Sequence, residues 1–535
     1  MSTFVAFFNK SLKKLKHTTA NKQMKKILFL LVFMLLPLAA SAIDWVIDGI
    51  NYELNRKTKT AQVIALTGRE GYTGDIIIPS SVNYHGEYSV TSIANYAFSS
   101  CSKLTSVTIP NTVTSIGGNV FEGCSSLNSI VIEEGNPNYD SRENCNAIIG
   151  TASNKLLYGC NGTIIPSSVT SIGSLAFLGS GITSITIPDE VTSIESNAFE
   201  KCKALSYIYI GKSVESIGYY VFGECDNLKT VEINSNAIVS KNYNFNESNV
   251  GSLFDGAFNI EELIIGDEVT SIGDCAFIDC NLTSVKMSDN VTTIGNSAFR
   301  LSRLSSVKLS NNLTDIGEWA FYGCRLSTIT IPESVKCINL FAFQNCNYLT
   351  KVEVNSNEVV SRDGDQFYTL MSCFGKQVKE YVLGEGIKKI AYIAFAESEK
   401  LTSVTLSSNL TCVDDSAFHE CTSLTDIYCY AEQVPETGKD IFVDSNYKNA
   451  TLHVPAASVE AYKNKEQWKD FGNIVALTDE DPKPTTEIMM TTAAQKPTVT
   501  VVECYTIDGK RITTPQRGMN IIKMSDGTVK KVVVK

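Results

Sequence analysis

The chain repeats a short alternation of hydrophobic and polar residues every 22 or 23 positions. In "LTSVTI" (Leu104–Ile109) the first, fourth and sixth residues are apolar, which approximates the two-residue period of a β-strand. A second, shorter alternation, "VTSIG", follows it, and its Val and Ile are predicted to point inward with the Gly easing a turn. Identical copies of this pentapeptide lie at 113–117, 169–173 and 269–273.

A phenylalanine marks the end of most repeats, usually in the form "AF" or "VF". The segment around it, as in "NVFEGC" (119–124), is too short for a stable helix and predicts one helical or 3₁₀ turn that buries the ring. Two repeats are longer, with Phe254 and Phe374 as anchors and lateral loops expected at 237–251 and 358–372. The region 127–168 is expected to hold a degenerate repeat without an aromatic anchor. The regular anchors are Phe98, Phe121, Phe177, Phe199, Phe222, Phe277, Phe299, Phe321, Phe343, Phe395 and Phe418.

A single repeat of this length cannot cover its own apolar side, whereas stacked repeats form one continuous core. The pattern therefore predicts a β-rich repeat solenoid with one short strand pair and one helical or 3₁₀ turn per unit. Neighbouring backbones would pair at the spacing of a β-sheet, about 4.8 Å.

The third residue after the anchor phenylalanine is Cys in eight repeats and Ser at Ser180, Ser302 and Ser398. A position that accepts either residue favours a small side chain with a weak hydrogen bond over a disulfide partner. Most of the 16 cysteines are therefore expected to be buried free thiols, with a few bridges as the alternative, for example between Cys145 and Cys160. The eight cysteines are Cys101, Cys124, Cys202, Cys225, Cys280, Cys324, Cys346 and Cys421.

The frame "LxxVxIPxxVxxIGxxAFxxC" covers most of 90–445 and resembles the BspA-like leucine-rich repeats, also called the Treponema pallidum type. That family occurs on the surfaces of Bacteroidales and some parasites. The resemblance implies a leucine-rich-repeat-like solenoid over 90–450, with a β cap at 43–89 before it and a closing cap at 451–476 after it.

The amino-terminal sequence predicts export. From Met24, "MKKILFLLVFMLLPLAASA" has two lysines, an apolar core and an A-x-A cleavage site that ends at Ala42. Residues 24–42 are therefore predicted to be a signal peptide, and 1–23 an untranslated or disordered extension. The mature protein is expected at the cell surface, attached to the outer membrane, or secreted.

The carboxy-terminal sequence changes composition after the closing cap. Residues 477–499 are predicted to be a linker. Residues 500–535 alternate apolar and polar residues around two Asp-Gly turns and predict a small β domain. This tail resembles the sorting domain of type IX secretion, which implies the type IX secretion machinery as a partner. The alternative is a β module that merely ends the chain.

The composition and motifs do not point to catalysis. A net charge of -11 disfavours nucleic acid as a partner, because such proteins present basic patches. The sequence has no H-E-x-x-H, C-x₂-C or phosphate-binding glycine motif, so no catalytic, metal or cofactor residue is predicted. His419 lies two residues before Cys421, but that cysteine occupies the buried repeat position, which makes a catalytic pair a poor interpretation.

The sequence therefore predicts a non-enzymatic, adhesin-like recognition protein that binds a protein or glycan on a host or bacterial surface. The alternatives are a glycan-binding protein or a structural scaffold of the envelope, and for each named residue a solvated sheet face with no ligand. Exposed positions beside the apolar strand residues are candidate ligand contacts: Tyr207, Tyr209, Lys229, Glu232, Lys286, Lys308, Lys351, Glu353, Tyr428 and Tyr430. The two long loops add Tyr243, Phe367 and Tyr368.

Overall fold

The computed structural model describes residues 44–66, 71–243, 245–246, 249–250, 253–254, 257, 259–362, 368–485, 501–506, 511–512, 518–524 and 529–534. The chain divides into two compact units, Met1–Thr485 and Thr486–Lys535. The predicted signal peptide, with its cleavage residue Ala42, lies outside the described residues.

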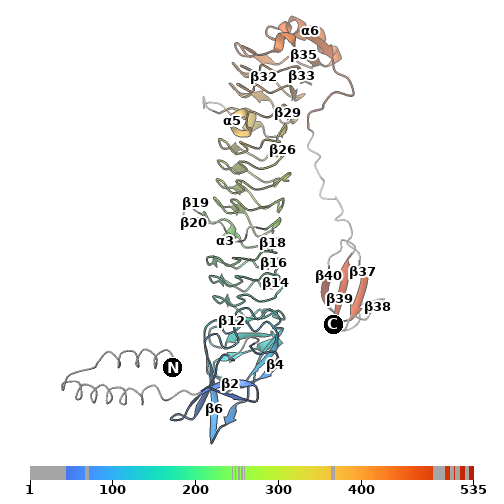
Figure 1. The fold of residues 1–535 in the computed structure, drawn as a ribbon. Helices are drawn as coiled ribbons and strands as arrows, with labels where there is room; N and C mark the ends of the chain where they lie inside the picture. Colours follow the sequence, from blue (N-terminus) through green and yellow to red (C-terminus); the bar gives the residue numbers. More distant parts are fainter. Residues whose placement is uncertain are drawn as a thin grey trace, which may run out of the picture. The chain divides into compact units, whose positions relative to one another are not determined.

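The first unit is a stack of repeats that forms a β-solenoid, as the sequence predicts (Figure 1). Each regular repeat contributes one long strand and one short strand, and strands of successive repeats pair in parallel. The long strands form a five-stranded sheet, β14 (Ser184–Ile187), β16 (Tyr207–Ile210), β18 (Thr230–Ile233), β21 (Glu262–Ile265) and β23 (Ser284–Met287). They also form a seven-stranded sheet, β26 (Thr328–Ile331), β28 (Lys351–Val354), β29 (Glu380–Leu383), β31 (Ser403–Leu406), β33 (Asp426–Cys429), β35 (Thr451–Val454) and β36 (Asn473–Ala476).

The short strands hold the "VTSIG" pentapeptides and their variants, as in β13 (Ser171–Ile172), β15 (Ser193–Ile194) and β17 (Ser216–Ile217). Val169 and Ile172 are fully buried, which confirms the predicted inward positions. The predicted role of the glycine is wrong. Gly117 does not have a positive φ, and a Cβ added there would lie 2.4 Å from the backbone nitrogen of Asn95 in the preceding repeat. Glycine at this position therefore permits close stacking of repeats.

The anchor phenylalanines stack along the solenoid in a ladder of rings. Centroids of successive rings from Phe98 to Phe442 lie 4.8–5.9 Å apart where two phenylalanines meet. Phe254 and Phe374 take their predicted places in this ladder. Outside the two longer repeats, each ring lies in a hydrogen-bonded turn that a positive φ closes at both ends, for example +53° at Asn119 and +70° at Gly123. Left-handed residues at both ends prevent a longer helix.

Thiols beside the ladder donate hydrogen bonds to the backbone of the preceding repeat. The distance from Sγ to the carbonyl oxygen of the preceding anchor phenylalanine is 3.0–3.3 Å at Cys124, Cys202, Cys225, Cys324, Cys346 and Cys421. These contacts confirm the expected weak hydrogen bond for cysteine. Cys145 and Cys160 are also buried free thiols.

Among the described residues, serine reproduces this bond at none of its three positions. The hydroxyls of Ser302 and Ser398 are buried without a hydrogen-bond partner in the described part of the chain. The expected hydrogen bond is therefore wrong for these two serines. The Cβ–Oγ bond of serine is shorter than the Cβ–Sγ bond of cysteine, so the hydroxyl oxygen does not reach the carbonyl oxygen of the preceding repeat. Ser180 instead lies 3.5 Å from Cys202 Sγ.

The Ser302→Cys substitution is therefore expected to stabilise the protein by about 1–2 kcal/mol, because it replaces a buried unpaired hydroxyl with a thiol that reaches the Phe277 carbonyl. The reciprocal Cys324→Ser substitution is expected to destabilise it by about 1–3 kcal/mol, because it breaks the bond to the Phe299 carbonyl. Urea unfolding followed by circular dichroism measures both changes. Equal stability of the two variants and the wild type would show that the thiol bond contributes nothing.

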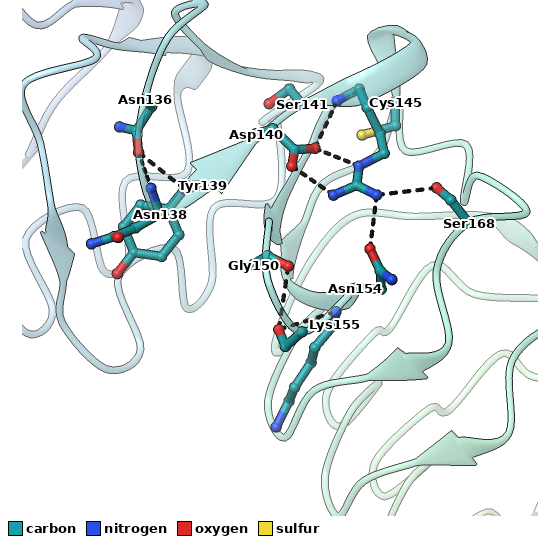
Figure 2. Close-up of polar contacts among 12 residues, drawn as sticks. Asn136, Asn138, Tyr139, Asp140, Ser141, Cys145, Gly150, Asn154, Lys155 and Ser168 are labelled. Carbon is teal, nitrogen blue, oxygen red and sulfur yellow. Dashed lines mark hydrogen bonds and ion pairs between the residues drawn. The ribbon is translucent and has the colours of Figure 1, made fainter.

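The predicted degenerate repeat at 127–168 is present, because its long strand β9 (Ser129–Ile132) pairs in parallel with β7 (Leu104–Ile109), and β12 (Lys155–Gly159) pairs in parallel with β13. It also carries an irregular insertion, in which β10 (Tyr139–Asp140), β11 (Ala147–Gly150) and β12 pair as antiparallel neighbours. Arg142 binds both oxygens of Asp140 at 2.7 Å and also donates to Asn154 at 2.9 Å (Figure 2). The ion pair with Arg142 lowers the pKa of Asp140 despite its partial burial. The insertion does supply an aromatic contact, because the Tyr158 ring meets Phe121 edge-on at 5.8 Å.

The two longer repeats fold alike. Each begins its extra segment with a four-residue helix, α3 (Asn236–Val239) or α4 (Asn357–Val360). Ser235 and Ser356 cap these helices by accepting the backbone N–H of the third helical residue. The second repeat adds α5 (Leu370–Phe374), which places Phe374 in the ladder.

Both ends of the solenoid are closed by other structure. At the amino end, β1 (Asp44–Ile47), β2 (Ile50–Asn55) and β3 (Thr60–Val63) are antiparallel, and β3 pairs in parallel with β6 (Glu87–Ile93). At the carboxyl end, α6 (Val459–Asn464) and the buried Trp468 lie over the last repeat, and Trp468 meets Phe442 edge-on at 5.8 Å. No helix in the described residues is long and apolar enough to cross a bilayer.

The second unit contains one antiparallel sheet. Its strands are β37 (Val501–Thr506), β38 (Arg511–Ile512), β39 (Gly518–Met524) and β40 (Val529–Val534), in the order β38-β37-β39-β40. In the sequence the two Asp-Gly pairs fall between β37 and β38 and between β39 and β40, and both pairs lie outside the described residues.

Candidate functional site

The outward face of the five-stranded sheet carries five of the predicted residues: Tyr207, Tyr209, Lys229, Glu232 and Lys286. Strands in this sheet alternate between buried apolar side chains and outward ones, so β16 turns Tyr207 and Tyr209 away from the core. The residues paired with them across the sheet are Thr230 and Glu232 of β18. All four side chains are half-buried.

Diagonal hydrogen bonds tie this face together. The Tyr207 hydroxyl donates to Glu232 at 2.7 Å, and Lys286 donates to Glu262 at 2.6 Å. Lys229 forms an ion pair with Glu261 at 3.0 Å. Because each contact joins neighbouring repeats, the solenoid holds these side chains in defined positions before any ligand arrives.

Burial and neighbouring carboxylates keep the tyrosines protonated. Burial raises the pKa of Tyr207, and the hydrogen bond to Glu232 raises it further. Burial and the nearby Asp189 carboxylate raise the pKa of Tyr209. Both phenols therefore present a neutral ring at physiological pH.

The seven-stranded sheet carries the other predicted strand residues. Lys351 lies 3.0 Å from Glu380 and 3.7 Å from Glu353, so one lysine joins two carboxylates on this face. Tyr428 stacks on His453 with ring centroids 4.4 Å apart. Tyr430 follows β33 directly and is half-buried.

Lys308 is exposed, but it does not lie in a strand. The described segment from Leu304 to Ser310 forms no strand, and this gap separates the five-stranded sheet from the seven-stranded sheet. The prediction of a short strand pair in each unit therefore fails at this repeat, which lacks the long strand. The outward surface therefore lies on separate faces: the five-stranded sheet, the seven-stranded sheet and a three-stranded sheet of β4 (Gly74–Ile77), β7 (Leu104–Ile109) and β9 (Ser129–Ile132).

The loop residues do not form a second exposed aromatic surface. Tyr368 is 5% exposed, with the Arg362 guanidinium 4.4 Å above its ring, so its predicted exposure is wrong. Tyr243 packs partly against the core, and its hydroxyl donates to the Ile238 carbonyl at 2.8 Å. Phe367 lies outside the described residues.

The prediction from the sequence did not include three residues of these faces, although the strand alternation places their side chains outward. Glu262 and Glu380 begin "ELII" and "EYVL" at outward positions, and each accepts the lysine described above. His453 is the outward residue of "TLHV" and lies 3.0 Å from Asp426. Extending the two-residue period to every repeat would have found all three.

The described residues show no arrangement suited to catalysis. No group of three or more His, Cys, Asp and Glu side chains there could hold a metal ion. Burial raises the pKa of Cys421 to about 12, and its thiol points at the Phe395 carbonyl. A hollow of about 380 Å³ over the short strands is lined by serines, Gly218 and Glu195, and the Lys155 ammonium lowers the pKa of that carboxylate.

The parallel strands, the short repeat and the buried phenylalanine ladder together define a β-solenoid of the leucine-rich-repeat class. The family model described as "BspA type Leucine rich repeat region" matches residues 76–146, 151–254, 251–370 and 368–467. The chain belongs to this family.

Similar solved structures include three bacterial repeat proteins. A leucine-rich repeat protein from Bacteroides ovatus is 24% identical, with a TM-score of 0.36, and the match covers 82% of this chain and 100% of that one. A leucine-rich cell surface protein from Faecalibacterium prausnitzii is 24% identical over 73% of this chain and 96% of that one, with a TM-score of 0.29. The T. pallidum leucine-rich repeat protein is 22% identical over 43% and 86%, with a TM-score of 0.24. No curated protein matches the chain.

Proposed function

We propose that this protein is a non-enzymatic, adhesin-like recognition protein that binds a protein or glycan on a host or bacterial surface. The observation that carries this proposal is the outward face of the five-stranded sheet, where Tyr207, Glu232 and Lys286 are fixed by contacts between repeats. Such fixed side chains lose little conformational entropy on binding. Tyrosines at the centre of an interface are frequent sources of binding energy.

The proposal includes export. The signal-peptide pattern at 24–42 supports passage across the inner membrane. The resemblance of 500–535 to a type IX sorting domain supports recognition by that machinery, followed by surface attachment or release. Membership of the BspA-type repeat family supports a role in macromolecular interaction over one in catalysis.

Combined substitution of Tyr207→Ala and Tyr209→Ala is expected to weaken ligand binding at least tenfold, since a buried interface tyrosine contributes about 1–2 kcal/mol or more. The measurement is binding of the purified protein to an array of extracellular-matrix proteins, mucin and bacterial surface glycans. Tyr392→Ala is the matched control, because this tyrosine is 48% exposed in an anchor turn away from the sheet. Equal losses in both variants, or no binding to any array member, would contradict the proposal.

A further inference from the structure

The segment that follows β36 returns across the outward face of the seven-stranded sheet. Residues 477–485 leave the closing cap and lie alongside strands that come earlier in the sequence (Figure 1). The Thr485 carbonyl accepts the backbone N–H of Glu385 at 3.2 Å, and the Thr485 hydroxyl contacts the side chain of Asn355. These contacts place the end of the segment beside β29 and β28, 100 or more positions away in the sequence.

The start of the segment is held beside β33 and β35. The Asp481 carboxylate lies 3.9 Å from His453 Nδ1, while the other nitrogen of this imidazole lies 3.0 Å from Asp426. Asp481 also accepts the backbone N–H of Thr478 at 2.7 Å, which shapes the turn that sends the chain back over the sheet. Burial and nearby carboxylates that include Asp481 raise the pKa of Tyr428 and Tyr430.

The sheet beneath the segment is covered where it would otherwise face solvent. Val382 of β29 and Thr405 of β31 occupy outward positions, yet they are only 2% and 1% exposed. The equivalent residue Thr330 of β26, which the segment does not reach, is exposed. Pro484 of the segment is itself buried, whereas its neighbour Lys483 is exposed.

The segment is chemically suited to cross a sheet at right angles to its strands. From Asp481 to Thr485 it passes from β33 to β28, three steps of about 4.8 Å, and four extended residues span about 13 Å. Pro482 and Pro484 favour this extended form and bring no N–H group that would need a partner against the sheet.

We propose that the outward face of β29, β31, β33 and β35 is a docking surface for extended, acidic, proline-containing peptide segments, and that residues 478–485 of this chain are its resident occupant. The face binds another such segment only after its own has lifted. This inference extends the proposed function to the second sheet. Docking of the segment is measured without any external ligand and on a different sheet from Tyr207, so the two proposals fail separately.

The first test is hydrogen–deuterium exchange of the full chain. Asp481→Ala, Pro484→Gly and Thr485→Gly combined in one variant are expected to speed exchange of the Glu385 amide at least tenfold, because that N–H donates to Thr485. The Gly384 amide, which donates to Val354 in the repeat ladder, is expected to stay protected. Lys483→Ala is the matched control and is expected to leave both amides unchanged. Unchanged exchange at Glu385 in the triple variant would overturn the proposal.

The second test uses the labelled peptide LTDEDPKPT, which corresponds to 477–485, and measures fluorescence anisotropy. The peptide is expected to bind the triple variant at least tenfold more tightly than the wild-type chain, whose face is occupied. The same peptide carrying Asp481→Ala is expected to bind the triple variant at least tenfold more weakly than the unaltered peptide, because it lacks the carboxylate that faces His453. Equal affinity for the variant and the wild type, or equal affinity of the two peptides, would overturn the proposal.

Discussion

Replacing Phe222 by alanine is expected to lower the free energy of unfolding by about 3–5 kcal/mol, the usual cost of deleting a fully buried aromatic ring. Phe222 is 1% exposed and lies in the ladder between Phe199 at 5.7 Å and Phe254 at 5.9 Å. The substitution removes ring contacts on both sides, and the rigid turns that hold the backbone limit collapse into the space. The loss therefore includes a cavity as well as lost burial.

The same substitution is expected to change the course of unfolding. In a repeat protein each unit is stabilised mainly by its neighbours, so a weak repeat in the middle separates two cooperative blocks. Urea unfolding followed by circular dichroism is expected to show two transitions in Phe222→Ala and fewer in the wild type. Tyr219→Ala is the matched control, three residues earlier in the same turn and 80% exposed, and is expected to change stability by less than about 0.5 kcal/mol. Similar losses in the two variants would show that the ladder does not carry the stability.

The fold could be predicted from the sequence because one physical constraint recurs in every repeat. A unit of 22 or 23 residues has to bury the same apolar positions, and the likeness of the two longer units to each other identified Phe254 and Phe374 as anchors despite their longer loops. The donor role of the repeated cysteine also followed from its exchange with serine. Ser302 does not form the hydrogen bond to the backbone carbonyl because its side chain is slightly shorter than that of cysteine, and the residue pattern does not reveal this small difference in distance.

The candidate site could be predicted only in part. Strand alternation placed Tyr207, Glu232 and Lys286 on one face, because side-chain direction in a strand follows from position alone. Contacts made by residues outside the strands could not be predicted in the same way. Arg362 covers Tyr368, and a segment with a linker-like composition covers Val382, and neither burial leaves a local signal in the sequence.

The stability of the folded chain is expected to fall steeply as the pH rises above about 9, because the buried thiols resist ionisation. Burial raises the pKa of five of them to about 12, from an ordinary value of 9.0: Cys124, Cys280, Cys346, Cys373 and Cys421. Between these two pH values the unfolded chain has lost thiol protons that the folded chain keeps. The folded state therefore binds more protons, and its stability decreases with rising pH. This contribution is fully present below pH 9 and is lost as the pH rises towards 12.

Each such thiol lowers the free energy of unfolding by about 1.4 kcal/mol per pH unit in this window. Summed over the whole window, the loss from the five thiols exceeds the roughly 5–15 kcal/mol free energy of unfolding of ordinary domains. Urea unfolding at pH 8, 9, 10 and 11 measures the slope. Cys346→Ala is expected to start from a lower stability at pH 8 and to decline less steeply, by about 1.4 kcal/mol per unit, because one titrating group is gone. Ser398→Ala changes the same repeat position without removing a thiol and is expected to keep the wild-type slope. A slope in Cys346→Ala equal to that of the wild type would show that the ladder thiols do not govern alkaline unfolding.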